Sequence, residues 1–135
     1  MANQHIQPDD LWPSAQYGFS QVVVSTGTKV IHCAGQTAWD KDMNLVGGDD
    51  LEQQTVQALE NIKSALAAAG ATMKDVVRLD IYVVDYDRDK LPAIGTATSR
   101  YFDPDHLPAS TLLGIDALAM PEFLIEITAT AVVDA

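Results

Sequence analysis

Few residues in this chain have the type and spacing that metal binding or nucleophilic catalysis requires. The histidines His5, His32 and His106 lie far apart, and no histidine–cysteine spacing is typical of a zinc site. The single cysteine, Cys33, lies in an apolar run, which favours a packed thiol over a nucleophile. We therefore expect neither a metal nor a cofactor.

Glu126 and Ser110 are the polar strand residues whose chemistry is of most interest. Phe123, Ile125 and Ile127 alternate along a predicted strand and share one face. Glu126 lies between two of them, so its carboxylate points to the opposite face. A carboxylate can transfer protons, whereas the Ser110 hydroxyl offers one neutral hydrogen bond worth about 1 kcal/mol. Taken alone, both are typical of ordinary strand residues.

Length and charge limit the classes of protein and of partner. The 135 residues predict one domain over 1–135, which is long enough to bury a core without disulfides or metals. The 19 acidic and 8 basic residues give a net charge of −11, which repels phosphate backbones and anionic membranes. We expect neither a nucleic acid nor a membrane as a partner.

The expected location follows from the ends and the hydropathy of the chain. The first residues have neither the basic region nor the apolar stretch of a signal peptide, and no segment approaches the ~20 apolar residues of a membrane span. A lone cysteine suits a reducing compartment. Together these features predict a cytoplasmic protein.

The clearest predicted element is a helix over residues 51–69, in which apolar residues recur at helical spacing. Asp49 and Asp50 precede it and are expected to cap the helix rather than to bind a cation. Gly70 follows at the position of a left-handed cap. A second, shorter helix is predicted over residues 92–101.

Strands account for most of the remaining sequence. Residues 1–16 are polar and proline-containing, and we expect them to form an irregular lead-in. Segments 20–25 and 29–34 are predicted to pair as a hairpin across a Thr-Gly-Thr turn. Further strands are predicted at 77–84, 109–115 and 123–133. This β-β-α-β-α-β-β order predicts an α+β fold with a mixed sheet and two helices on one face.

The sheet face that the helices leave uncovered also carries apolar side chains, among them Val84, Leu124 and Val132. A sheet that is apolar on both faces needs a second covering surface. We therefore predict a homo-oligomer.

Five segments match the motifs of one family in the same order. They are Ile31-His32-Cys33-Ala34-Gly35-Gln36, Ala67-Ala68-Ala69-Gly70, the strand 76–83, Leu107-Pro108-Ala109-Ser110-Thr111 and the strand 125–132. In their order and spacing these segments resemble the RidA (YjgF-like) family over about residues 15–133.

The resemblance implies a fold, an assembly and a chemistry. Proteins of this family have a chorismate-mutase-like α+β fold and form homotrimers whose sheets face inward, with a cleft between neighbouring protomers. In the deaminating members, an arginine after Pro-Ala grips the carboxylate of an enamine or imine. A glutamate on the last strand positions the water that releases ammonia.

Carried over residue by residue, the resemblance implies a modified site. Glu126 stands at the position of the glutamate, and Gly35 stands where a backbone amide faces the ligand. Ser110 stands at the position of the arginine. The further ligand-binding positions also depart from the family pattern: Phe19 replaces a frequent tyrosine, Gly95 an asparagine and Leu112 a frequent cysteine. The segment 114–121 is about one residue longer than usual.

The replacement of arginine by serine changes the expected ligand. A serine hydroxyl cannot reproduce the bidentate fork by which arginine holds a carboxylate. We therefore expect the cleft to take a neutral or cationic small molecule with Glu126 as its polar anchor. A basic residue from a neighbouring protomer, such as Arg100, would reverse this expectation.

Three functions remain open at this stage. The favoured one is a homotrimer that binds a small metabolite between protomers, with hydrolysis of C–N bonds as its candidate reaction. The second is an active enamine or imine deaminase in which another group replaces the arginine. The third is a non-enzymatic trimer with an interaction or chaperone-like role. The acidic charge argues against the endoribonuclease activity assigned to some members of the family.

Overall fold

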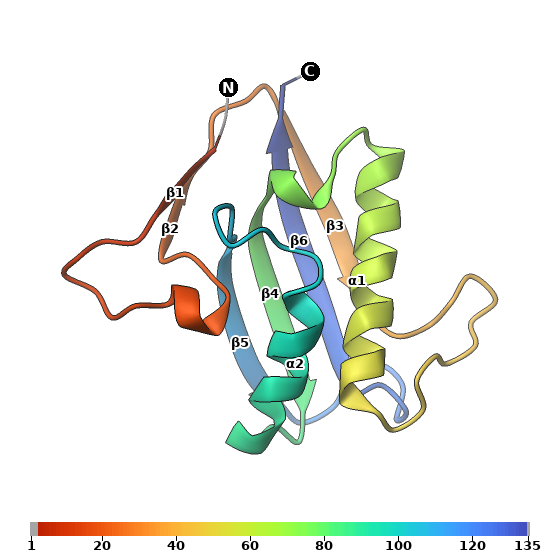
Figure 1. Cartoon of the computed structure of the whole chain (residues 1–135). Helices are drawn as coiled ribbons and strands as arrows, with labels where there is room; N and C mark the ends of the chain where they lie inside the picture. The colour runs from red at the N-terminus through yellow and green to blue at the C-terminus, as the bar shows by residue number, and fades with distance from the viewer. Residues whose placement is uncertain (1–2, 135) are drawn as a thin grey trace.

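The structure, a computed structural model, describes residues 3–134 (Figure 1). Residues 1 and 2 of the predicted lead-in and residue 135 of the predicted domain lie outside this part of the chain. The strands are β1 (Gln4–Ile6), β2 (Val22–Val24), β3 (Lys29–Gln36), β4 (Val76–Val84), β5 (Ala109–Ile115) and β6 (Ile125–Val133). The helices are α1 (Leu51–Ala68) and α2 (Leu91–Thr98), with short 3-10 helices η1 (Ala15–Tyr17), η2 (Met73–Asp75) and η3 (Arg88–Lys90).

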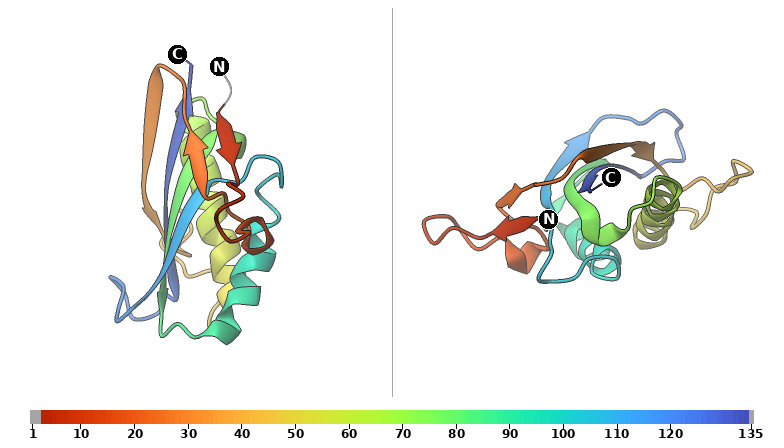
Figure 2. Two further views of the ribbon diagram at one scale, coloured as in Figure 1. Left: turned by 90° about the vertical axis from the view of Figure 1, so that its left-hand side faces the viewer. Right: turned by 90° about the horizontal axis from the view of Figure 1, so that it is seen from above.

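The main sheet has four strands in the order β3-β6-β4-β5. β4 and β5 run parallel, whereas β6 is antiparallel to both of its neighbours, so the sheet is mixed. Seen edge-on, α1 and α2 both lie on one side of this sheet (Figure 2). The predicted α+β architecture, with two helices on one face of a mixed sheet, is confirmed.

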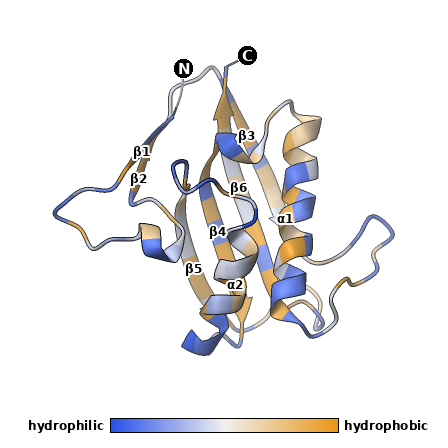
Figure 3. Ribbon diagram, viewed as in Figure 1, coloured by the Kyte–Doolittle hydropathy of each residue, from blue (hydrophilic) through white to orange (hydrophobic). Residues whose placement is uncertain are grey.

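The core lies between these helices and the sheet. Leu59, Ile62 and Leu66 of α1 are fully buried, as are Ile125 and Ile127 of β6. Burying an aliphatic side chain of this size stabilises the fold by about 1.5–3 kcal/mol. The alternation of polar and apolar residues along the strands and around α1 is visible in Figure 3, and it produces this one-sided core.

The ends of α1 follow the predicted capping residues. The Asp50 carboxylate accepts a hydrogen bond from the Gln53 backbone nitrogen at 3.0 Å. Gly70 adopts a φ of +83°, a conformation that favours glycine. Both caps are local, and the predicted helix is therefore correct to within one residue at its C-terminal end.

The predicted hairpin between residues 20–25 and 29–34 is wrong. β2 instead pairs with β1, a strand within the expected irregular lead-in, whereas β3 pairs with β6. The connection between β2 and β3 contacts the end of β6, where the Thr28 nitrogen donates to the Val133 carbonyl at 3.2 Å. The Thr-Gly-Thr sequence does favour a turn, but long-range contacts decide which strands pair.

The uncovered face of the sheet is mixed rather than apolar throughout. Val30 and Leu113 are 55% and 50% exposed on this face. Between them, Arg78 donates hydrogen bonds of 2.9 Å to Asp80 and to Thr111. This face, which we call the open face, therefore combines exposed apolar side chains with a polar network. Among residues 3–134, no helix has the length and apolarity needed to cross a membrane.

Candidate functional site

The segment that carries Phe19 is fixed by side chains that bond to the backbone. The hydroxyl of Ser14, which is fully buried, donates to the Phe19 carbonyl at 2.7 Å. The Ser20 hydroxyl donates to the Leu107 carbonyl at 2.7 Å. These bonds hold η1 and the following residues against the chain that leads into β5.

Helix α2 supplies the opposite wall. Pro92 lies in the first turn, where its missing N–H leaves no helical hydrogen bond unmade. Ile94 and Ala97 are buried against the core. An added Cβ at Gly95 would contact nothing within 4 Å, so this position leaves open space beside the helix.

An apolar groove runs between η1, α2 and the sheet, and we call it the α2 groove. Its inner cavity, of about 260 Å³, is lined by four of the predicted site residues, namely Phe19, Gly95, Ser110 and Leu112. Its outer cavity, of about 510 Å³, continues past Tyr17, Leu91 and Phe102, which border both cavities. The volume of the outer cavity is typical of small-molecule sites, and that of the inner cavity is slightly smaller.

The register of the parallel strands explains why Ser110 faces the groove. Ser110 is aligned with Leu79 of β4, and Leu112 is aligned with Ile81. Leu79 and Ile81 both point to the helix side and are buried. The Ser110 hydroxyl makes no side-chain hydrogen bond to any residue in the described range 3–134, so it is free to bond a ligand.

Glu126 and Gly35 form a second cluster, on the open face. Glu126 is aligned with Tyr82, which also points away from the helices. Its carboxylate lies directly over Gly35, since a Cβ on Gly35 would be 2.0 Å from Glu126 Oε2. Gly35 lies within the irregular register of β3 between Cys33 and Gln36. The missing side chain of Gly35 therefore makes the space that the carboxylate occupies.

The Glu126 carboxylate has no hydrogen bond or ion pair with the described residues 3–134. It is half-buried, so one side of it is open to whatever lies against the open face. A carboxylate held in this way can accept a proton from a bound water or ligand.

The six predicted site residues are thus divided into two clusters. Ser110 and Glu126 lie two strands apart, about 10 Å across the sheet, and on opposite faces of it. A small ligand in the α2 groove cannot reach Glu126 of the same chain, because the sheet lies between them.

Arg88 and Tyr17 are among the groove residues that were not predicted from the sequence. Arg88 lines the outer cavity, and so does Tyr17. Arg100, the basic residue that was considered, is instead paired with Glu52 of α1 at 2.9 Å. Arg88 lies among Asp85, Asp87 and Asp89, and nothing in that sequence pattern indicates that its side chain borders a cavity.

The cysteine is positioned as a structural residue. Cys33 packs against the core cluster between the helices and the sheet. Burial raises the pKa of its thiol, which disfavours the reactive thiolate. We therefore assign Cys33 no part in the site.

Comparison with known proteins identifies the family. The family described as Endoribonuclease L-PSP matches residues 11–133. A RutC family protein of Saccharolobus solfataricus is 34% identical over 110 residues, which are 79% of this chain and 84% of that protein.

Solved structures agree with this match. A Yersinia pestis protein of unknown function from the conserved Rid protein family, YyfB, is 43% identical, with a TM-score of 0.94 over 98% of this chain and 100% of that one. A putative endoribonuclease from Thermotoga maritima is 32% identical, with a TM-score of 0.70 over 96% and 93% of the two chains. The fold is accordingly the chorismate-mutase-like fold of these proteins. The chain belongs to the Endoribonuclease L-PSP family, that is, the RidA (YjgF-like) family.

Proposed function

We propose that this protein is a homotrimer that binds a small metabolite between protomers and hydrolyses a C–N bond in it. The α2 groove of one protomer supplies Phe19, Gly95, Ser110 and Leu112. The open face of the next protomer supplies Gly35 and Glu126. One observation carries the proposal: the two clusters lie on opposite faces of one sheet, so only a second protomer can bring them together.

The chemistry of the inner cavity limits the part of the ligand that lies there. Its described lining is apolar apart from Ser110, Thr98 and the Tyr17 hydroxyl, and it contains no basic side chain. An anionic group placed there would lose its water without gaining a counter-charge. The end of the ligand against Ser110 is therefore neutral or cationic, as is the carbon–nitrogen double bond of an imine or its protonated form.

Glu126 supplies the proton transfers that hydrolysis requires. Its carboxylate accepts a proton from water as the water oxygen bonds to the imine carbon, and the double bond becomes a single C–N bond. In the protonated imine that proton then passes to the resulting NH2 group, and as the C–N bond breaks the carboxylate takes the remaining hydroxyl proton, so that ammonia and a carbonyl compound leave. A carboxylate in this role accelerates a reaction by about 10²- to 10⁴-fold.

Imine turnover tests the proposal directly. Imines that carry no carboxylate, generated in the assay from primary amines by an amine oxidase, are offered to the wild type and to Glu126→Gln, and carbonyl product is measured against the uncatalysed rate. We expect the wild type to accelerate hydrolysis and Glu126→Gln to lose at least about 100-fold of that acceleration.

Glu122→Gln is the matched control, because Glu122 is exposed and lies just before the same strand. It should retain wild-type turnover and, like Glu126→Gln, should sediment at three times the 14.5 kDa protomer mass. Equal turnover in the wild type and Glu126→Gln would refute the assigned role of Glu126, and a monomeric wild type would refute the shared site.

A further inference from the structure

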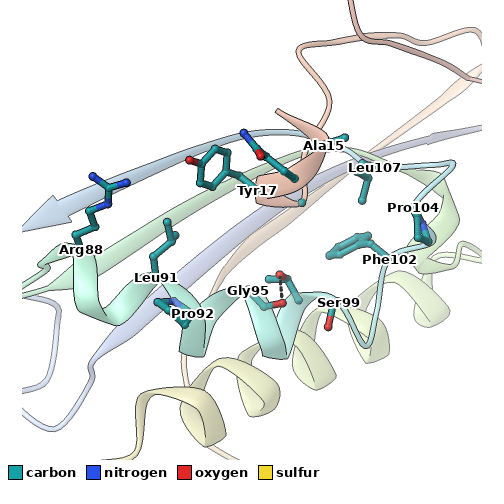
Figure 4. Close-up of a pocket in the computed structure, with 13 residues that line it drawn as sticks. Ala15, Tyr17, Arg88, Leu91, Pro92, Gly95, Ser99, Phe102, Pro104 and Leu107 are labelled. Carbon is teal, nitrogen blue, oxygen red and sulfur yellow. Dashed lines mark hydrogen bonds between the residues drawn. The ribbon is translucent and has the colours of Figure 1, made fainter. Parts of the chain in front are cut away.

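The outer cavity of the α2 groove has one polar end. Arg88 lies at that end, and the Tyr17 ring turns its hydroxyl toward the same end (Figure 4). Phe102, Pro104 and Leu107 lie at the other end. A ligand that fills this cavity therefore meets hydrogen-bond donors at one end and apolar surface along its length.

Arg88 differs from the other two arginines in having no side-chain partner among the described residues 3–134. Arg78 donates to Asp80 at 2.9 Å, and Arg100 pairs with Glu52 at 2.9 Å. The Arg88 guanidinium makes no hydrogen bond or ion pair with any of residues 3–134. The chain has 19 acidic residues, yet within residues 3–134 the arginine that borders the cavity is the one without an ion pair.

Two of the aspartates around Arg88, namely Asp85 and Asp87, have other partners. Asp87 caps η3 by accepting a hydrogen bond from the Asp89 nitrogen at 2.9 Å. Asp85 lies 4.0 Å from the Lys90 ammonium group, which also donates to the Asp85 carbonyl. The local backbone and Lys90 satisfy these carboxylates, so the guanidinium keeps its planar fork available for an added carboxylate.

The Tyr17 hydroxyl adds a second donor. It makes no hydrogen bond within the described part of the chain, 3–134. The ring is held in place by an edge-on contact with Trp12, at a centroid distance of 6.0 Å. Two unpaired donors at one end of an apolar cavity are complementary to a carboxylate on an apolar chain.

We infer that Arg88 and Tyr17 bind the carboxylate of an amphipathic monoanion whose apolar body lies along α2 toward Ser110. From Arg88 to Gly95 the chain advances by about 10 Å at the helical rise per residue. The carboxylate is therefore about 10 Å from the group that lies in the inner cavity. The inference rests on the proposed function. It departs from the neutral or cationic ligand expected from the sequence, because this ligand carries a negative charge at the end remote from Ser110.

This arrangement differs from a carboxylate clamp at residue 110. An anion gripped there would be directly next to the reacting C–N bond, as in an α-imino acid. An anion held at Arg88 selects substrates in which an apolar chain separates the carboxylate from the C–N bond.

Binding of three eight-carbon probes tests the inference. Octanoate, 1-octanol and octylamine are titrated by calorimetry into the wild type, Arg88→Gln and Arg88→Lys. Arg100→Gln is the matched control, since Arg100 is also exposed but pairs with Glu52 outside the groove. We expect octanoate to bind the wild type at least tenfold more tightly than Arg88→Gln, with Arg88→Lys between them and Arg100→Gln unchanged. Octanol binding should be the same in all four proteins.

Equal octanoate affinity in Arg88→Gln and the wild type would overturn the inference. So would octylamine or octanol binding the wild type where octanoate does not. Failure of all three probes to bind would overturn both this inference and the groove as a ligand site. These titrations do not test the proposed reaction, which is tested by the imine turnover of the wild type and Glu126→Gln.

Discussion

The inner cavity of the α2 groove and the Gly35–Glu126 cluster lie on opposite faces of one sheet, and they are built differently. The cavity has walls from η1, α2 and two strands, so many contacts define its shape. The carboxylate depends on a single close contact, the one over the bare Cα of Gly35. We therefore expect the cavity to tolerate substitution and the carboxylate cluster not to tolerate it.

The largest effect is expected at Gly35. In Gly35→Ala, the new methyl group would occupy the space of Glu126 Oε2, and the flexible glutamate side chain has to move away. Imine turnover should fall about 100-fold, as in Glu126→Gln, while the melting temperature changes little. Glu122→Gln is the control, because Glu122 is exposed and lies just before β6. Full turnover in Gly35→Ala would show that the position of the carboxylate is unimportant.

An effect of intermediate size is expected at Gly95, where a larger side chain should stabilise the fold but weaken ligand binding. Glycine is less favourable than alanine in a helix by about 0.8–1 kcal/mol, and leucine ranks just below alanine, so Gly95→Leu should raise the free energy of unfolding. Its side chain would also fill part of the inner cavity and weaken octylamine binding by about tenfold, which corresponds to about 1.4 kcal/mol. Denaturant unfolding and calorimetry measure the two effects. Unchanged octylamine binding would show that the inner cavity is not the site.

The smallest effect is expected at Tyr101, which joins the end of the α2 segment to α1. Burial, together with a 2.6 Å hydrogen bond to Glu60, raises the pKa of Tyr101 to about 12. Because this pKa lies above the ordinary value near 10, the stabilisation is complete below pH 10 and is lost as the pH rises from 10 toward 12.

Tyr101→Phe should remove this alkaline dependence and cost about 1 kcal/mol or less at neutral pH. The free energy of unfolding, measured between pH 7 and 11, checks both effects. Tyr82→Phe on the open face is the control. An alkaline loss of stability that persists unchanged in Tyr101→Phe would contradict the assignment.

The elements predicted correctly are those whose signals are local. Helix α1 combines a continuous apolar stripe with Asp50 and Gly70 at its ends, and these residues act within one turn of the backbone. The hairpin prediction failed because the pairing of β2 with β1, and of β3 with β6, depends on contacts between distant segments.

Candidate site residues could be proposed from the sequence, but their arrangement could not. The alternation around Glu126 correctly placed its side chain away from the core. The face on which Ser110 lies depends on its alignment with Leu79, a register that no local pattern specifies. Arg88 was not predicted because its place beside the cavity depends on how α2 and η1 lie relative to each other, which no local sequence pattern specifies.

The most direct test of the shared site is cross-linking between its two halves. In a Cys33→Ala background, Ser110→Cys and Glu126→Cys are combined in one chain and treated with a short bis-maleimide. The sheet separates the two cysteines within a protomer, so a cross-link between neighbours is the one expected. We predict covalent trimers on a denaturing gel, and only uncross-linked protomers when either cysteine is present alone. Persistence of the double variant as single protomers would contradict the claim that neighbouring protomers complete each site.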